Sequence, residues 1–166
     1  MRSFLLFIIL QAVLFPKKID QNRQFTIAVQ ERNTFQPLIN YENALLAAKK
    51  ANQKLLIYFS SPTSVPCVQM EEDLFQDSAI KHLLAHKLMC FNANLTERTA
   101  LPLKDQYFSK IIGKKVSTIG EKLQELQLSR FKANMTPYFV IIDPNSNLVL
   151  ERKGRLNKKE FISFID

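Results

Sequence analysis

The sequence between residues 55 and 71 reads LLIYFSSPTSVPCVQME. Its first five residues are apolar or aromatic and favour a strand, which is typical of a strand buried inside a sheet. A loop follows over residues 60–66, which contain serine, threonine and two prolines. We then expect a helix to begin at Cys67. Its apolar side would be formed by Val68, Met70, Leu74 and Phe75. The segment therefore predicts a strand, a loop and a helix in direct succession.

The flanking sequence predicts the remaining elements. Upstream, Asn40 is expected to cap a helix over residues 41–51, and residues 25–29 alternate as a short strand does. Downstream, we expect a helix over 79–86 capped by Asp77 and Ser78, and then a strand over 88–93. A loose, basic stretch over 95–132 follows, with a long helical insert at about 97–132 and a helix near 121–131. The last expected elements are a strand over 137–142, a turn over 143–147, a strand over 148–150 and a helix capped by Asn157.

The order of these elements predicts the fold class. A strand, a helix and a strand are followed, after the insert, by two strands and a helix. This order is typical of the thioredoxin fold, an α/β fold in which a central mixed β-sheet carries helices on both faces. In that fold the chemistry takes place where the first strand of the βαβ half meets its helix. Here that place is residues 64–71.

Composition limits the class of protein further. The chain has 166 residues, of which 46% are hydrophobic, enough for one domain that needs neither disulfide nor metal to fold. These values exclude a disordered tail and a multi-span membrane protein. Two cysteines are too few for a disulfide scaffold. Three glycines exclude the glycine-rich phosphate loops, and we expect no cofactor.

The N-terminus carries a dense apolar run over residues 4–15, FLLFIILQAVLF. Twelve residues are too few to span a bilayer, which needs about 20, but they fit the hydrophobic core of a signal peptide with Arg2 before it. We therefore expect residues 1–15 to be a signal peptide or membrane anchor, 16–39 an extension and 40–166 the domain. The protein would be periplasmic or otherwise exported, and anchored to the inner membrane if the run is retained. The alternative is a buried element at the start of the domain.

Ser64 stands at the first position of the expected redox motif, C-x-x-C, and Cys67 at the second. In such a motif the helix N-terminus activates the first thiol, and the second thiol then resolves the mixed disulfide. A serine hydroxyl cannot form a disulfide. The two-thiol cycle therefore cannot run at this site.

The sequence from residue 41 onward resembles the C-terminal thioredoxin-like domain of the thiol:disulfide interchange protein DsbD, in the form found in Bacteroidetes-type bacteria. The matching segments are ALLAAKK at 44–50, VPC at 65–67, ME at 70–71, NANLT at 92–96, TIGEK at 118–122, FKAN at 131–134 and TPYFVIID at 136–143. Family members usually carry T-G-x-x-C-V-N-C-R-K-M-E. This chain departs from that motif at Ser64, Pro66, Val68 and Gln69.

The resemblance implies a peptide-binding groove beside the motif. It implies that Pro137 is cis and that the backbone of Thr136 lines the groove. Val65 and Pro66 would form the opposite side. These four residues are the expected substrate-binding residues, with Ser64 and Cys67 in the catalytic positions.

Cys67 has two interpretations, a lone thiol that forms mixed disulfides or an inert buried residue. Cys90 lies in a predicted core strand, where packing is its expected role, and a Cys67–Cys90 bridge is a minor alternative. His82 and His86 are spaced as metal ligands can be, but they lack a third ligand, so we expect a solvated helix face and no metal site. No histidine and acid are placed to make Ser64 a hydrolytic nucleophile.

The net charge of +8 lacks the interleaved aromatic residues of nucleic-acid readers, so we expect a solvated basic surface and no nucleic acid. The first functional hypothesis is an exported protein with a degenerate S-x-x-C motif that binds cysteine-containing proteins, or a redox membrane partner, through a thiol or by one-thiol exchange. The second is a redox-inactive binding module that uses the groove beside Pro137. The third is an active thiol-disulfide oxidoreductase. Membrane association is expected, if at all, through residues 4–15.

Overall fold

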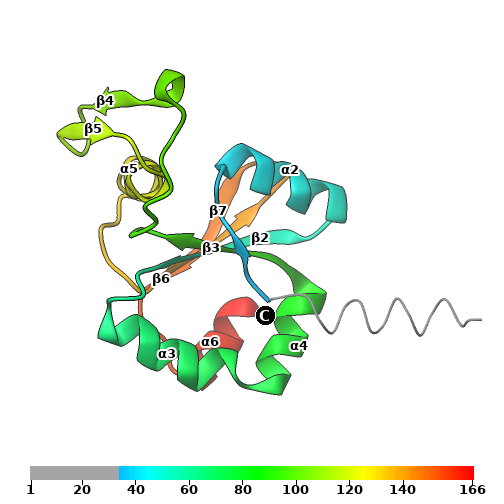
Figure 1. The fold of residues 1–166 in the computed structure, drawn as a ribbon. Coiled ribbons are helices and arrows are strands. Elements are labelled where there is room, and N and C mark those ends of the chain that lie inside the picture. The colour runs from blue at the N-terminus through cyan, green and yellow to red at the C-terminus, as the bar shows by residue number, and fades with distance from the viewer. Residues whose placement is uncertain (1–33) are drawn as a thin grey trace, which may run out of the picture. The chain divides into compact units, whose positions relative to one another are not determined.

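A five-stranded sheet forms the centre of the computed structural model, which describes residues 34–166 (Figure 1). The strands lie in the order β1-β3-β2-β6-β7. Their bounds are Gln36–Pro37 for β1, Lys54–Ser60 for β2, Leu88–Asn94 for β3, Tyr138–Asp143 for β6 and Leu148–Lys153 for β7. The first three are parallel, whereas β6 runs antiparallel to β2 and β7 antiparallel to β6. The mixed sheet is as predicted.

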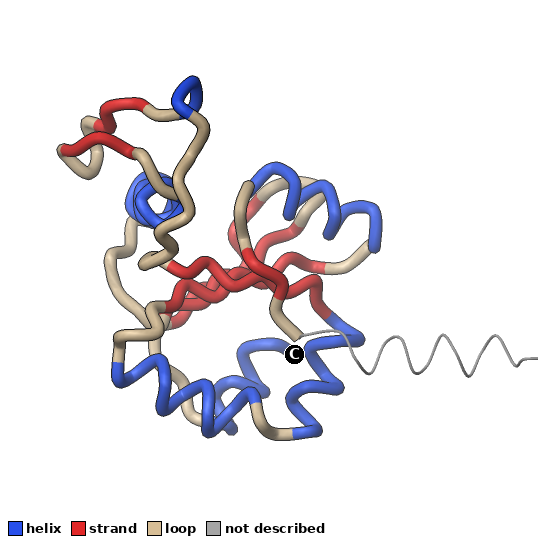
Figure 2. Tube along the Cα trace, viewed as in Figure 1, coloured by secondary structure: helices blue, strands red, loops and turns tan. Residues whose placement is uncertain are grey.

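Five α-helices cover the two faces of this sheet (Figures 1 and 2). One face carries α2 (Tyr41–Ala51) and α5 (Ile119–Phe131), and the other carries α3 (Val65–Phe75), α4 (Ser78–Lys87) and α6 (Lys158–Ile165). None of the helices in residues 34–166 is both long and apolar enough to cross a membrane.

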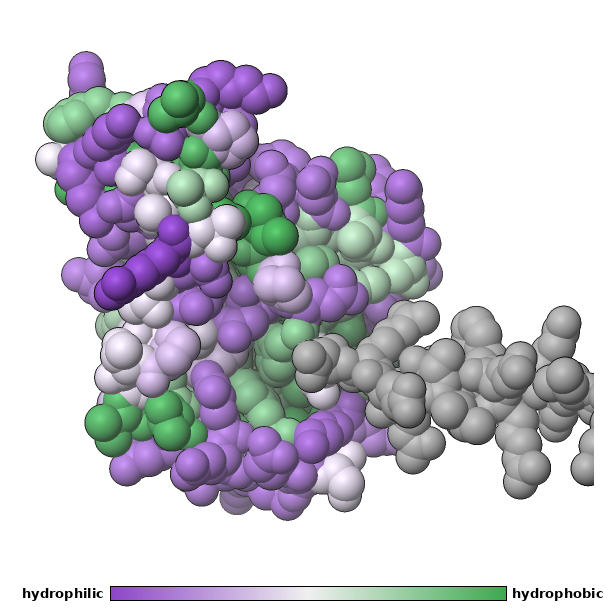
Figure 3. Space-filling model, in the orientation of Figure 1, coloured by the Kyte–Doolittle hydropathy of each residue, from purple (hydrophilic) through white to green (hydrophobic). Residues whose placement is uncertain are grey.

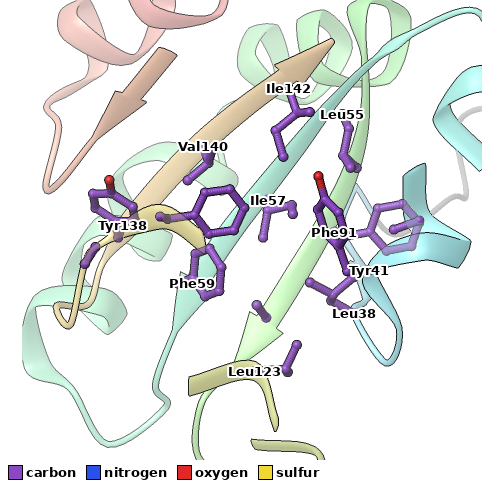
Figure 4. Packing of buried hydrophobic residues seen from close by; sticks show 14 of the residues in the cluster. Leu38, Tyr41, Leu55, Ile57, Phe59, Phe91, Leu123, Tyr138, Val140 and Ile142 are labelled. Atoms are coloured by element: carbon purple, nitrogen blue, oxygen red, sulfur yellow. The ribbon is translucent and has the colours of Figure 1, made fainter. Parts of the chain in front are cut away.

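The central strand β2 divides the core into two clusters, because successive side chains of a strand point to opposite faces. Leu55, Ile57 and Phe59 pack toward α2 and α5 (Figure 4). Leu56 and Tyr58 face α3, α4 and α6. All five side chains are buried, which explains why the sequence of β2 is a continuous apolar run rather than an alternating one.

The helix starts follow the predicted caps. The side chain of Asn40 accepts a hydrogen bond from the backbone N–H of Asn43, and that of Asp77 accepts two from the first turn of α4. Asn157 forms a capping box with Glu160 at the start of α6. These contacts satisfy N–H groups that the first turn of a helix otherwise leaves unpaired.

Three expectations were wrong in detail. Helix α3 begins at Val65 rather than Cys67. Pro66 is tolerated there because an N–H group in the first turn of a helix would have no acceptor within the helix, so its loss costs nothing. Val68 is exposed and does not belong to the apolar side of α3. The insert is not wholly helical. It contains a short 3-10 helix, Leu103–Asp105, and a separate hairpin of β4 (Tyr107–Ser109) and β5 (Lys114–Val116).

Two sequence features are outside the described residues. These are the apolar run over residues 4–15 and the expected strand over 25–29. Within the described part, β1 pairs with β3, and Leu38 next to it is buried in the core. The last residues of the expected N-terminal extension therefore contribute to the sheet.

Candidate functional site

The site lies at the end of β2, where the chain turns into α3. Ser64 is the N-cap residue of α3 and is half-buried. Its carbonyl accepts hydrogen bonds from the backbone N–H groups of Cys67, at 2.9 Å, and Val68, at 3.1 Å. Its hydroxyl makes no capping hydrogen bond. The side chain in the position of a first redox thiol is thus a hydroxyl that takes no part in holding the helix.

Cys67 is the third residue of α3 and is buried in the core. Its exposed fraction is 0%. The hydroxyl of Tyr58, on β2, donates a hydrogen bond of 2.9 Å to Oε1 of Glu71, which lies one turn after Cys67 on α3. Burial raises the pKa of Tyr58 above its ordinary value, and Cys67 and then Glu71 raise it further. The thiol therefore lies beside a hydroxyl that stays protonated and donates a hydrogen bond.

Pro137 lies at the same end of the sheet as Ser64. Because β2 and β6 are antiparallel and Phe59 pairs with Tyr138, the end of β2 lies beside the start of β6 (Figure 1). The Thr136–Pro137 peptide bond is cis. The structure thus brings the two sides of the expected groove to the same end of the sheet, where β2 ends and β6 begins.

The loop before Pro137 is fixed from behind by α5. The side chain of Gln127 is fully buried, and its Nε2 donates a hydrogen bond of 2.8 Å to the carbonyl of Met135. The backbone of Thr136, a half-buried residue, makes no backbone hydrogen bond to other residues between 34 and 166. The loop is therefore held in place while its outer edge is left unpaired.

Exposed apolar side chains lie near this end of the sheet. Val65 and Pro66 are exposed in the first turn of α3, Val68 is exposed one turn later, and Met135 is exposed in the loop before the cis-proline. These exposed side chains flank the same end of the sheet, and apolar surface gathered in one place is a feature of binding sites. The arrangement can bind a polypeptide segment without any chemistry at Cys67.

The other candidate residues lie elsewhere. Cys90 is buried in β3, burial raises the pKa of its thiol to about 12, and both cysteines are free, so the alternative disulfide is not formed. The rings of His82 and His86 lie 4.2 Å apart on the exposed side of α4. Within residues 34–166 no three metal-ligating side chains gather.

Sequence reasoning missed Tyr58, Glu71 and Gln127. Tyr58 was counted only as part of the apolar run. Its hydroxyl could have indicated a polar contact inside the core, because a buried tyrosine needs a partner for its O–H group. Glu71 follows Cys67 by four residues and so shares its side of the helix. Gln127 gave no signal, since nothing local ties it to residue 135.

These features define a protein of the thioredoxin class, with a strand–loop–helix site opposite a cis-proline. The model of the family described as "Thioredoxin-like domain" matches residues 41–166. The chain belongs to this family.

Solved structures share the fold. A structure described as "DsbH Oxidoreductase" gives a TM-score of 0.57 at 20% sequence identity, covering 78% of this chain and 80% of that chain. A thioredoxin from Thermus thermophilus gives 0.54 at 21% identity, covering 78% of this chain and 81% of that chain. These two similarities confirm the predicted α/β fold. The comparison with curated proteins gave no match.

Proposed function

We propose that this protein binds cysteine-containing polypeptides noncovalently in the groove between Ser64–Pro66 and Thr136–Pro137. One observation carries the proposal: a hydroxyl occupies the position of the first thiol, and the only sulfur of the motif, that of Cys67, is fully buried. A two-thiol cycle needs a second sulfur at position 64, which Ser64 does not supply.

The groove offers what an extended peptide needs. The free backbone groups of Thr136 suit main-chain hydrogen bonds to a bound strand. Val65 and Met135 supply exposed apolar surface on the two sides. The resemblance to the C-terminal domain of DsbD supports the same class of partner, cysteine-bearing proteins or a redox membrane protein, because the departures of this chain fall on the thiol motif and spare the segment at 136–143.

One-thiol exchange is the second candidate, favoured by the contacts of Cys67. The hydroxyl of Tyr58 lies beside the thiol and donates a hydrogen bond to the carboxylate of Glu71, one turn after Cys67 on α3. If Cys67 became accessible, its thiolate would attack a disulfide of the partner, forming a mixed disulfide and releasing the other sulfur as a thiolate. The thiolate of an external thiol would then attack the partner's sulfur in the mixed disulfide, which leaves a disulfide between that thiol and the partner and releases Cys67 as a thiolate.

The proposal includes export. The apolar run over residues 4–15 supports a signal peptide or anchor, followed by an extension and by the domain at 40–166. Export would bring the protein to an oxidising compartment, the periplasm or its equivalent, where proteins with disulfides are found.

Fluorescence anisotropy of labelled reduced insulin B chain, an extended cysteine-bearing peptide, tests the binding function. We expect the thiol form and its alkylated form to bind equally well, since no covalent bond is needed. The double substitution Val65→Ser and Met135→Ser should weaken binding about tenfold, whereas Leu148→Ser, an exposed apolar control on β7, should not. Covalent capture of a B chain whose cysteines carry glutathione mixed disulfides, lost in Cys67→Ala, would favour one-thiol exchange. Binding of none of the three forms would refute both.

A further inference from the structure

The hairpin β4–β5 and the 3-10 helix before it carry exposed apolar side chains among lysines. Leu103 is 85% exposed, Phe108 68% and Ile111 54%. We call these three residues, with Lys104, Lys110, Lys114 and Lys115, the hairpin surface. Apolar atoms stand out at the surface of this part of the molecule, at the upper left of Figure 3. Three large apolar side chains this exposed within nine residues need an explanation.

Phe108 is not buried against the domain because the other side of the hairpin packs there. Val116 and Ser109 are buried, and the side chains of Tyr107 and Ser109 both donate hydrogen bonds to the carboxylate of Glu125 on α5. Since strand side chains alternate, Phe108 lies on the opposite side, paired across the hairpin with Lys115. The hairpin thus contacts α5 with one side and exposes its other side to solvent.

The charge of the hairpin surface has one sign. Residues 103–116 contain four lysines and one acid, Asp105, a net charge of +3. Lys114 pairs with Glu121 at 3.3 Å. The ammonium groups of Lys104, Lys110 and Lys115 form no ion pair with residues 34–166. These three charges are therefore available to an anionic partner.

We propose that the hairpin surface docks on an anionic lipid membrane. Insertion into the headgroup region buries protruding apolar side chains one by one, while lysine stems extend along them and place the ammonium groups among lipid phosphates. A protein partner would instead need a complementary hollow or a broad flat face.

This inference goes beyond the proposed function, because it concerns a surface that the peptide groove does not use. It also differs from an anchor at residues 4–15, because docking would be peripheral and salt-sensitive. It predicts a protein whose domain contacts the bilayer through a defined face rather than only through a tether.

The chain contains no tryptophan, so a single substitution gives a local reporter. In the full chain, we expect the indole of a Phe108→Trp variant to shift its emission to the blue with phosphatidylglycerol-containing vesicles and to be quenched by brominated acyl chains. A Leu148→Trp variant should show neither effect. Vesicles of phosphatidylcholine alone should bind at least about tenfold more weakly, and added salt should release the protein from anionic vesicles.

Two further variants show which side chains of the hairpin surface contribute to vesicle binding. Replacing Leu103, Phe108 and Ile111 together by serine, or Lys104, Lys110 and Lys115 together by serine, should each weaken vesicle binding at least about tenfold. Circular dichroism would establish that both variants fold. The proposal is wrong if the hairpin indole is unaffected while the chain cosediments with vesicles, if both triple variants bind as the parent does, or if no vesicle binds. An emission shift that depends on protein concentration alone would indicate self-association and would also overturn it.

Discussion

At the residue scale, the candidate site is set apart by a serine at the position of the first thiol of a C-x-x-C motif. Ser64 occupies the N-cap of α3, three residues before Cys67, and the backbone around it is that of an ordinary helix start. A hydroxyl thus stands at the helix start where a C-x-x-C motif would place its first thiol. Tyr58 lies beside the remaining sulfur and donates a hydrogen bond to Glu71.

Placing a sulfur at position 64 tests whether the helix start has the geometry of a redox site. We expect the Ser64→Cys variant to form a disulfide with Cys67, because the two positions span a single helical turn, as in a C-x-x-C motif. Mass spectrometry after alkylation, in a Cys90→Ala background, would detect the loss of both free thiols. If both thiols stay free under oxidising conditions, the turn between Ser61 and Ser64 does not have redox-site geometry.

At the element scale, α5 fixes both the groove and the hairpin, and its start depends on Gly120. A Cβ at this position would lie 2.7 Å from the backbone carbonyl oxygens of Leu95 and Glu97, closer than packing permits. Since backbone cannot move aside as a flexible side chain can, Gly120→Ala should destabilise the fold by about 1–3 kcal/mol.

Urea unfolding would measure this loss. Gly154→Ala is the matched control, because a Cβ there would lie 3.6 Å from the sulfur of Met135, in ordinary contact. Equal unfolding midpoints for the two variants would show that α5 does not need its close approach to residues 95–97.

The same helix start predicts a pH dependence. Glu121 forms a capping box with Thr118. The backbone N–H of Ser117 also donates to its carboxylate and is the largest cause lowering its pKa from 4.5 to about 2. Because the folded pKa lies below the unfolded one, the stabilisation is complete above about pH 4.5 and is lost as the pH falls toward 2.

Replacing the carboxylate by an amide isolates this contribution. Glu121→Gln should cost about 1 kcal/mol at neutral pH. The difference in unfolding free energy from the parent should shrink as the pH falls below about 4.5. Urea titrations of both chains at several pH values would measure it, and a difference that stays constant down to pH ~2.5 would contradict the assignment.

At the scale of the whole molecule, the sequence predicted the sheet well and the insert poorly. The strands β2 and β6 are strongly apolar, and Asn40, Asp77 and Asn157 are strong caps, so local chemistry determines those elements. The hairpin β4–β5 has three-residue strands that include lysines, and β1 has two residues. Such short elements depend on neighbours distant in the sequence.

The site was predictable only where it is local. Ser64 and Cys67 follow from the strand–loop–helix segment, and Pro137 came from the family resemblance. The contact of Tyr58 with Glu71 joins a strand to a helix, and the hydrogen bond from Gln127 to Met135 joins a helix to a loop. No sequence spacing predicts either of these two contacts. The burial of Cys67, which decides between the functional hypotheses, also depends on how α3 packs against the sheet.

The accessibility of Cys67 in the folded protein tests the central claim most directly. In a Cys90→Ala background, a small maleimide should label Cys67 at least about a hundredfold more slowly without urea than with it, because labelling must await an opening of the fold. The Ser64→Cys variant, kept reduced, controls for reagent activity, since its half-buried N-cap position should react in the folded state. Equal labelling of Cys67 with and without urea would contradict noncovalent binding in a groove whose thiol does not react, and would make Cys67 the reactive centre of the protein.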